Sequence, residues 1–252
     1  GMWRGARIEL VPLGHMERPQ LVTERAGADE ARLSLSVEGF AGTHSLQLQL
    51  HPRHGAQLAD GSHSWRVDTP SKSRFALRVE LAEKDDGRVA FDQTFPLQTR
   101  AGRNWVRESF TLAKPKLWWP NGMGEPHLYR VKLTLVREGN AEDALEFDYG
   151  IRTIRTLPTP GPRTADRWAD WQFAINGRPL FMKGMNWMPA DILLDLPRER
   201  YDWLVGAAQA AGIQLLRVWG GGILETEEFY ASCNRLGVLV WQDFPIGNRD
   251  TP

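Results

Sequence analysis

The chain has 252 residues, of which 42% are hydrophobic, and its 31 lysines and arginines equal its 31 aspartates and glutamates. This length and composition predict two domains of ordinary size, each with its own hydrophobic core. A formal charge of zero gives no electrostatic argument for nucleic acid or an anionic membrane, both of which need clustered basic residues. The apolar runs are far shorter than the roughly 20 residues of a membrane-spanning helix, so no span is predicted.

Two features of composition concern the compartment. The first residues lack the apolar core of a secretory signal, and the true N-terminus is expected to be missing, so the localisation stays open between cytoplasmic and secreted. The single cysteine, Cys233, cannot form an internal disulfide. It falls on the apolar face of a predicted helix, where we expect a small buried thiol.

Before residue 158 the chain repeatedly alternates apolar and polar residues, with turn-forming residues between the runs. Alternation of this length predicts antiparallel strands with one buried face, and seven such runs suit an immunoglobulin-like β-sandwich. We assign residues 17–157 to this sandwich and residues 1–16 to the last strand of a truncated domain upstream. The alternating runs are residues 7–11, 32–37, 45–50, 75–81, 106–110, 128–135 and 145–149.

A different pattern follows the segment 158–171, which is rich in proline and other turn formers and is predicted to be a linker. Residues 173–182 predict a hairpin with its turn at Asn176-Gly177, because this dipeptide adopts the positive φ of a type I′ loop. The hairpin leads into a first strand. Two further strands are predicted at Leu215–Val218 and at residues 238–241.

Helices are predicted between these strands. Residues 198–211 carry apolar residues at helical spacing, with Pro197 at the start and Gly212 at the end. Residues 225–236 predict a second helix, with Glu225 in its first turn, where an acidic residue complements the helix dipole, and with Gly237 at its end. The fold class is therefore multidomain β plus α/β, in which residues 172–252 form the first three βα units of a (β/α)8 barrel. In such barrels the chemistry lies just after the strands.

Five motifs in this order support a family resemblance, which covers most of the chain. The first two resemble the end of the sandwich of glycoside hydrolase family 2, and the other three resemble its β-mannosidase branch. The resemblance implies a sugar-binding jelly-roll domain, a sandwich and a catalytic barrel, of which the first is nearly all missing and the third is cut short. The motifs are Leu-Trp-Trp-Pro-Asn-Gly from residue 117, Tyr-Gly-Ile-Arg from 149, Lys-Gly-Met-Asn-Trp-Met-Pro-Ala-Asp from 183, Arg-Val-Trp-Gly-Gly-Gly-Ile from 217 and Val-Trp-Gln-Asp-Phe from 240.

The resemblance implies a retaining exo-glycosidase that hydrolyses terminal β-D-mannose without a cofactor. Such an enzyme needs two carboxyl groups about 5 Å apart. In the family these are glutamates after the fourth and seventh barrel strands, which places both beyond Pro252. We therefore expect no catalytic residue in this chain, assign that role to neither Asp243 nor Glu225, and expect the chain alone to be inactive.

The alternatives are other family 2 activities or a module without activity. A β-galactosidase, a β-glucuronidase and an exo-β-glucosaminidase share the architecture, and the physical properties of these residues do not choose the sugar. A non-catalytic carbohydrate-binding or structural module is the other possibility.

Part of a sugar pocket is expected to remain in the chain. Arg217 resembles the arginine that hydrogen-bonds the nucleophile in this family, although a structural ion pair would explain it as well. Trp219 and Trp187 follow two strands, where an indole can stack on a sugar ring, but packing is the alternative for both. Asp243 and Asn186 are candidate ligands of sugar hydroxyls or, equally, loop-bracing residues. The glycines at 220–222 are expected to allow a tight turn beside this pocket.

Three other features receive structural interpretations. His51 and His54 lie close in sequence but have no acidic or cysteine companion, so no metal site is predicted. The Trp118-Trp119-Pro120 segment is interpreted as sandwich packing, as in the family, and not as a sugar platform. Three strands of an incomplete barrel would leave an unpaired edge, which predicts association or local disorder after residue 171 in the isolated chain.

Overall fold

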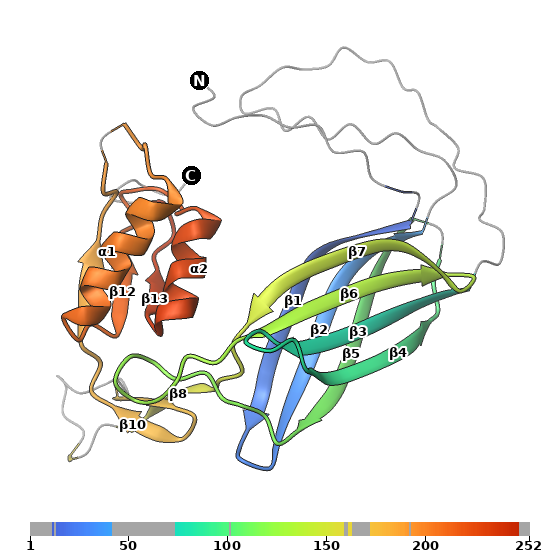
Figure 1. Cartoon of the computed structure of the whole chain (residues 1–252), viewed down its shortest axis with the longest axis horizontal. Helices are drawn as coiled ribbons and strands as arrows, with labels where there is room; N and C mark the ends of the chain where they lie inside the picture. Colours follow the sequence, from blue (N-terminus) through green and yellow to red (C-terminus); the bar gives the residue numbers. More distant parts are fainter. Residues whose placement is uncertain are drawn as a thin grey trace.

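The computed structural model describes residues 12, 14–41, 74–100, 102–158, 161–162, 172–191 and 193–246. The predicted strands at 7–11 and 45–50, the histidines His51 and His54, and most of the predicted linker lie outside these residues. In Figure 1 a β-sandwich and a smaller α/β unit lie side by side, and a short hairpin sheet adjoins the α/β unit.

Seven of the described strands form the β-sandwich, with antiparallel pairing throughout. One sheet has the order β1-β2-β5 and the other the order β4-β3-β6-β7. Alternate side chains of both sheets meet in one core, in which Leu33, Leu77 and Leu133 are completely buried. The strands are β1 (Gly14–Ala26), β2 (Glu30–Ala41), β3 (Phe75–Glu83), β4 (Val89–Leu97), β5 (Gly102–Ala113), β6 (Tyr129–Arg137) and β7 (Asn140–Tyr149).

Five of the predicted runs lie within or overlap β2, β3, β5, β6 and β7, but two strands were missed. β1 pairs with β2 from Gly14 onward, so the predicted domain boundary after residue 16 is wrong because it falls inside a strand. Arg18 has a positive φ of 51° at a register shift in β1, and Pro19 follows it, which breaks the alternation. β4 is an edge strand with few buried side chains and a proline, so its pattern is weak.

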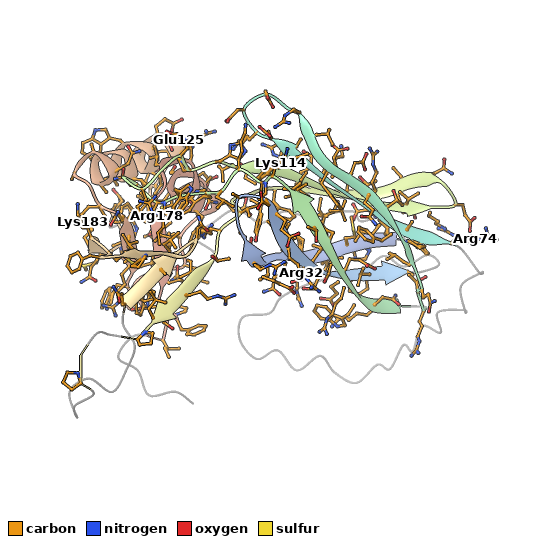
Figure 2. All side chains as sticks on the ribbon, turned by 90° about the horizontal axis from the view of Figure 1, so that it is seen from below. Arg32, Arg74, Lys114, Glu125, Arg178 and Lys183 are labelled. Carbon is orange, nitrogen blue, oxygen red and sulfur yellow. The ribbon has the colours of Figure 1, made fainter. Side chains whose placement is uncertain are left out.

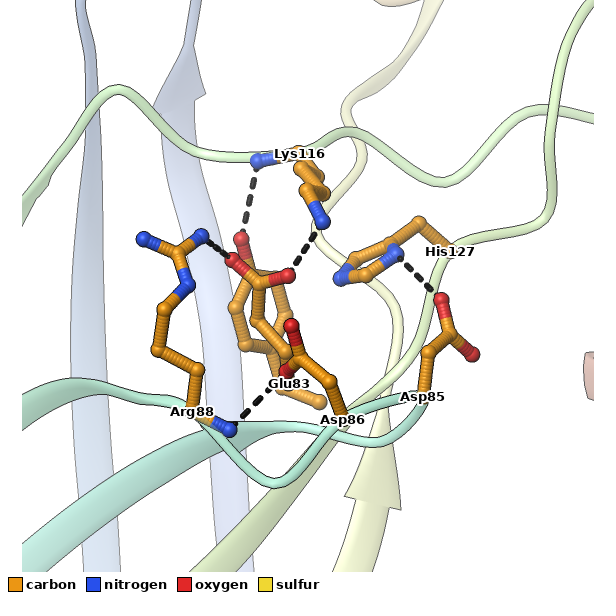
Figure 3. A network of polar contacts seen from close by, with 7 residues as sticks. Glu83, Asp85, Asp86, Arg88, Lys116 and His127 are labelled. Carbon is orange, nitrogen blue, oxygen red and sulfur yellow. Dashed lines mark hydrogen bonds and ion pairs between the residues drawn. The ribbon is translucent and has the colours of Figure 1, made fainter.

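A polar network closes one end of the sandwich (Figure 3). Glu83 is 2% exposed, and its carboxylate accepts hydrogen bonds from Arg88 and Lys116. Burial alone would raise the pKa of Glu83, but these two cations outweigh it and lower the pKa. His127 Nδ1 lies 3.5 Å from the Asp85 carboxylate, and His127 Nε2 is buried without a hydrogen-bond partner in the described part of the chain. The network joins the β3–β4 turn to the segment that leads into β6.

The α/β unit follows the predicted order closely. Its parallel sheet has the order β11-β12-β13, and two helices pack on one face of it through Leu216 and Val218. The predicted strand at Leu215–Val218 is confirmed, and the first helix ends one residue earlier than predicted. The elements are β11 (Gly184–Trp187), α1 (Arg198–Ala210), β12 (Leu215–Val218), α2 (Glu227–Leu236) and β13 (Leu239–Gln242).

The two ends of α2 differ in how well the sequence predicted them. Gly237 ends α2 in the left-handed conformation, at a φ of 70°. Cys233 is buried on this helix as predicted, and burial raises the pKa of its thiol to about 12. The helix begins only after Thr226, however, so Glu225 does not belong to its first turn. That prediction was wrong, and the position of Glu225 is described below.

A small sheet of the order β10-β9-β8 lies at the opposite end of the parallel sheet from the loops that follow its strands. It consists of β8 (Ile154–Leu157), β9 (Gln172–Ile175) and β10 (Arg178–Leu180). The predicted hairpin turn is confirmed, because Asn176 and Gly177 have φ values of 49° and 78°. Ile175 packs with Leu239 and Trp118 in a separate hydrophobic cluster.

The Trp118-Trp119-Pro120 segment joins the two larger parts of the structure. Trp118 is 1% exposed, and its Nε1 donates to the Asn234 carbonyl at 2.8 Å, at the end of α2. The Asn121 backbone N–H donates to the Gly237 carbonyl at 2.8 Å. Arg178, labelled in Figure 2, lies over the Trp119 ring at 5.2 Å. The interpretation as packing within the sandwich was therefore too narrow, because the segment packs against the α/β unit.

Candidate functional site

Three side chains share one row across the parallel sheet. Asn186, Arg217 and Trp241 are paired in register on β11, β12 and β13. Side chains alternate along a strand, and Leu216 and Val218, on either side of Arg217, are buried against the helices. The row therefore lies on the sheet face that the helices leave uncovered.

Arg217 is held in place by Asp243, the first residue after β13. Its Nε and Nη2 donate to the two carboxylate oxygens at 3.3 and 2.8 Å. The side chains are 44% and 21% exposed, so both groups reach solvent from the ends of adjacent strands. A two-pronged pair of this kind fixes the orientation of both groups. This is the structural pairing that the sequence left open for Arg217, and it leaves part of the guanidinium accessible.

The glycine loop after β12 is tight for identifiable reasons. A Cβ at Gly220 would lie 2.5 Å from the Phe244 carbonyl oxygen, and one at Gly222 would lie 2.9 Å from Pro189 Cδ. At Gly221 it would lie 2.2 Å from the Trp219 indole. The loop is thus wedged between the segments that follow the two neighbouring strands. The expected tight turn is confirmed, because the Gly222 N–H donates to the Trp219 carbonyl at 3.0 Å, while its place beside a sugar pocket stays a prediction.

Trp219 lies at the edge of this loop and is 39% exposed. Its backbone N–H donates to the Trp187 carbonyl at 3.0 Å, which fixes the point where the chain leaves the sheet. Its indole covers Gly221 and keeps a solvent-accessible part. An indole in this position can stack on an apolar face of a ligand.

An open cleft of about 440 Å³ lies between the loop after β11 and the glycine loop. Asp191, which the sequence reasoning did not select as a site residue, lines it. The Leu193 backbone N–H donates to Asp191 Oδ1 at 2.7 Å and Arg200 to Oδ2 at 3.0 Å. These contacts lower the pKa of Asp191, so its carboxylate remains an ionised acceptor at the cleft. The signal available in the sequence was an acidic residue directly after the first strand and its Met-Pro turn.

Trp187 lies on the other face of the sheet. It is 8% exposed, its ring packs 4.8 Å from that of Phe229, and its Nε1 donates to Glu225 Oε1 at 2.9 Å. The predicted stacking of a sugar on Trp187 is thus at odds with its position, which matches the alternative packing role. The structure brings Asn186, Arg217 and Asp243 together on the uncovered face, with Trp219 beside them.

Neither a metal-binding group nor a membrane-spanning helix is found among the residues that the structure describes. These contain no group of three or more histidine, cysteine, aspartate or glutamate side chains placed to hold a metal ion. They also contain no helix long and apolar enough to cross a membrane.

Comparison with known proteins identifies relatives of the chain. The model of the family described as "Glycosyl hydrolases family 2" matches residues 15–152, more than half of the chain. Beta-mannosidase B of Emericella nidulans is 34% identical over an alignment of 195 residues, and the match covers 72% of this chain and 22% of that protein. Beta-mannosidase B of Aspergillus flavus is 40% identical over 149 residues, 58% of this chain and 17% of that protein.

Solved structures agree. The Beta-D-Mannosidase of Dictyoglomus thermophilum matches with a TM-score of 0.73 and 26% identity, covering 94% of this chain and 25% of that one. A beta-glucuronidase of Bacteroides uniformis matches with a TM-score of 0.68, covering 93% of this chain and 24% of that one, but at 19% identity it shows the fold alone. This chain thus spans about a fifth of the length of the curated relatives. It belongs to glycosyl hydrolase family 2.

Proposed function

We propose that the chain is part of a β-mannosidase-like glycosidase that removes terminal β-linked mannose with retention of configuration. In this proposal strands β1–β7 are an immunoglobulin-like sandwich, and β11–β13 with α1 and α2 are the first three βα units of an eight-stranded barrel. The alternation of parallel strands and helices supports the barrel. The likeness to beta-mannosidases in sequence and structure supports the sugar.

One observation carries the proposal. Asn186, Arg217 and Asp243 lie together on the uncovered face of the sheet, at the ends of the three parallel strands. In a closed barrel that face is the interior, and the ends of the strands are where substrates bind. Trp219 and the cleft lined by Asp191 lie at the same end.

The proposed role of these residues is to bind the sugar and not to cleave it. A retaining glycosidase uses one carboxyl group as acid and base and another as nucleophile, about 5 Å apart. Arg217, fixed by Asp243, would present the rest of its guanidinium to the nucleophile and favour its ionised form. Asn186 and Asp243 would bind hydroxyl groups, and Trp219 would stack on the sugar ring. No step of the reaction is assigned to Glu225 or Asp243.

The test is hydrolysis of an aryl β-mannoside beside the matched β-galactoside and β-glucuronide. It compares a longer polypeptide, continued through the remaining barrel strands, with the 252-residue chain. We expect the longer polypeptide alone to hydrolyse the mannoside. Hydrolysis of another glycoside would refute the choice of sugar, and hydrolysis of none would refute the proposed activity and favour a binding or structural module.

A further inference from the structure

We propose that Glu225 is a positioning residue, which sets the spacing of the two loops that border the cleft. The inference rests on the proposed function for its kinetic consequence only. Its structural part concerns one buried carboxylate and the residues that donate to it.

Glu225 is 6% exposed although it carries a carboxylate. Oε1 accepts the Trp187 indole N–H at 2.9 Å, and Oε2 accepts the Tyr201 hydroxyl. The rings of both donors pack against Phe229, and Cys233 belongs to the same buried cluster. Burying a carboxylate is costly unless hydrogen bonds satisfy it, so a residue in this position is tightly constrained by its two donors.

The two donors come from different elements. Trp187 ends β11 and is followed by the loop that contains Pro189 and Asp191, whereas Tyr201 lies on α1. Glu225 itself lies near the end of the loop that begins at Trp219, directly before the N-cap Thr226. Its carboxylate therefore connects the loop after β11, the loop after β12 and helix α1.

Backbone contacts link the Glu225 carboxylate and its donor Trp187 to the candidate site. Trp187 directly follows Asn186, and its carbonyl accepts the Trp219 N–H at 3.0 Å. A shift of the Trp187 backbone would therefore reach the ends of both β11 and β12. Gly222 lies against Pro189 with no space for a side chain, so a shift of one loop is transmitted to the other. A misplacement of about 1 Å in such a site costs up to about a hundredfold in rate.

A matched control is Asp202, whose carboxylate connects α1 with α2. Asp202 on α1 accepts hydrogen bonds from Ser232 and Arg235 on α2, but it does not line the cleft. The Glu225→Gln change keeps the size of the side chain and one acceptor but removes the carboxylate that takes both donors. The Asp202→Asn change does the same to a carboxylate that pairs with Arg198 within α1 at 3.6 Å and with Ser232 and Arg235 on α2.

The first readout needs no activity. In the 252-residue chain with ¹⁵N-labelled tryptophan, we expect Glu225→Gln to shift the indole signals of both Trp187 and Trp219, and Asp202→Asn to leave the Trp219 signal in place. An unshifted Trp219 signal in Glu225→Gln would overturn the inference. Trp187→Phe, which removes the donor and keeps an aromatic ring, should shift Trp219 in the same way.

The second readout is kinetic, in the longer polypeptide. We expect Glu225→Gln to lower kcat/KM for the aryl mannoside about ten- to a hundredfold, whereas Asp202→Asn should keep its kcat/KM. An unchanged kcat/KM in Glu225→Gln would refute the positioning role. If the unsubstituted polypeptide hydrolyses no glycoside while Trp219 still shifts in Glu225→Gln, the proposed function fails and the structural inference stands.

Discussion

Asn121 is expected to stabilise the contact between the sandwich and the α/β unit through two side-chain hydrogen bonds. Its Nδ2 donates to the Gln209 carbonyl at 2.7 Å and to the Ile213 carbonyl at 3.1 Å. These carbonyls lie at and just after the end of α1, where intrahelical donors run out. Asn121 therefore acts as a helix cap that comes from a different part of the fold.

The cost of Asn121→Ala follows from what each carbonyl keeps. Gln209 O retains the Gly212 N–H at 2.9 Å, so its loss is about 1 kcal/mol, the net value of one hydrogen bond. Ile213 O loses the Asn121 donor, which costs about 1–3 kcal/mol for a partly buried acceptor. The backbone bonds of Asn121 remain. The sum is about 2–4 kcal/mol in the free energy of unfolding.

The assay is denaturant unfolding of the chain, followed by tryptophan fluorescence. Asn140→Ala is the matched control, because Asn140 is exposed at the β6–β7 hairpin, and we expect it to change the free energy of unfolding by less than about 0.5 kcal/mol. If Asn121→Ala falls within the same limit, the cap from the sandwich contributes nothing and the reasoning is refuted.

The remaining predictions concern the glycines and the pH dependence. Gly221→Ala should displace the Trp219 indole, which would lie 2.2 Å from the new Cβ, and so alter the fluorescence spectrum. Gly206→Ala, within α1 and with open space around its Cβ, should instead stabilise the chain by about 0.5–1 kcal/mol. An unchanged fluorescence spectrum in Gly221→Ala, or a lower melting temperature in Gly206→Ala, would contradict the corresponding prediction. Burial first, and Lys116 second, lower the pKa of His127 below its ordinary value of 6.5. As the pH falls, His127 is protonated in the unfolded chain at a higher pH than in the folded chain. Protonation therefore favours unfolding, and the free energy of unfolding should decrease as the pH falls below about 6.5. In His127→Gln this part of the pH dependence should vanish, and its persistence would assign it to another group.

The elements with regular local patterns could be predicted from the sequence. β12 was predicted at its observed residues, and the hairpin turn and the left-handed Gly237 followed from local chemistry. β1 and β4 were missed because their alternation is interrupted or weak. Their strand structure depends on pairing with neighbours, which no local pattern records.

The candidate site was predictable in part for the same reason. Residues at strand ends, such as Arg217 and Asp243, could be selected because parallel strands bring their ends together. The burial of Glu225 could not, since its donors Trp187 and Tyr201 lie 38 and 24 residues away. From the sequence alone, a glutamate two residues before a helix is interpreted as a residue that complements the helix dipole. Only the three-dimensional arrangement of its donors shows that it is buried. The contact of Trp118 with Asn234, 116 residues away, escaped for the same reason.

The most direct test of the account is a crystal structure of the longer polypeptide with a mannose-configured lactone bound. We predict that the sugar lies at the ends of β11–β13, in contact with the guanidinium of Arg217 or the carboxylate of Asp243, and with Trp219 beside its ring. A lactone bound on the sandwich, or at the end of the parallel sheet that faces the β9–β10 hairpin, would contradict the assignment of this face as the sugar-binding wall.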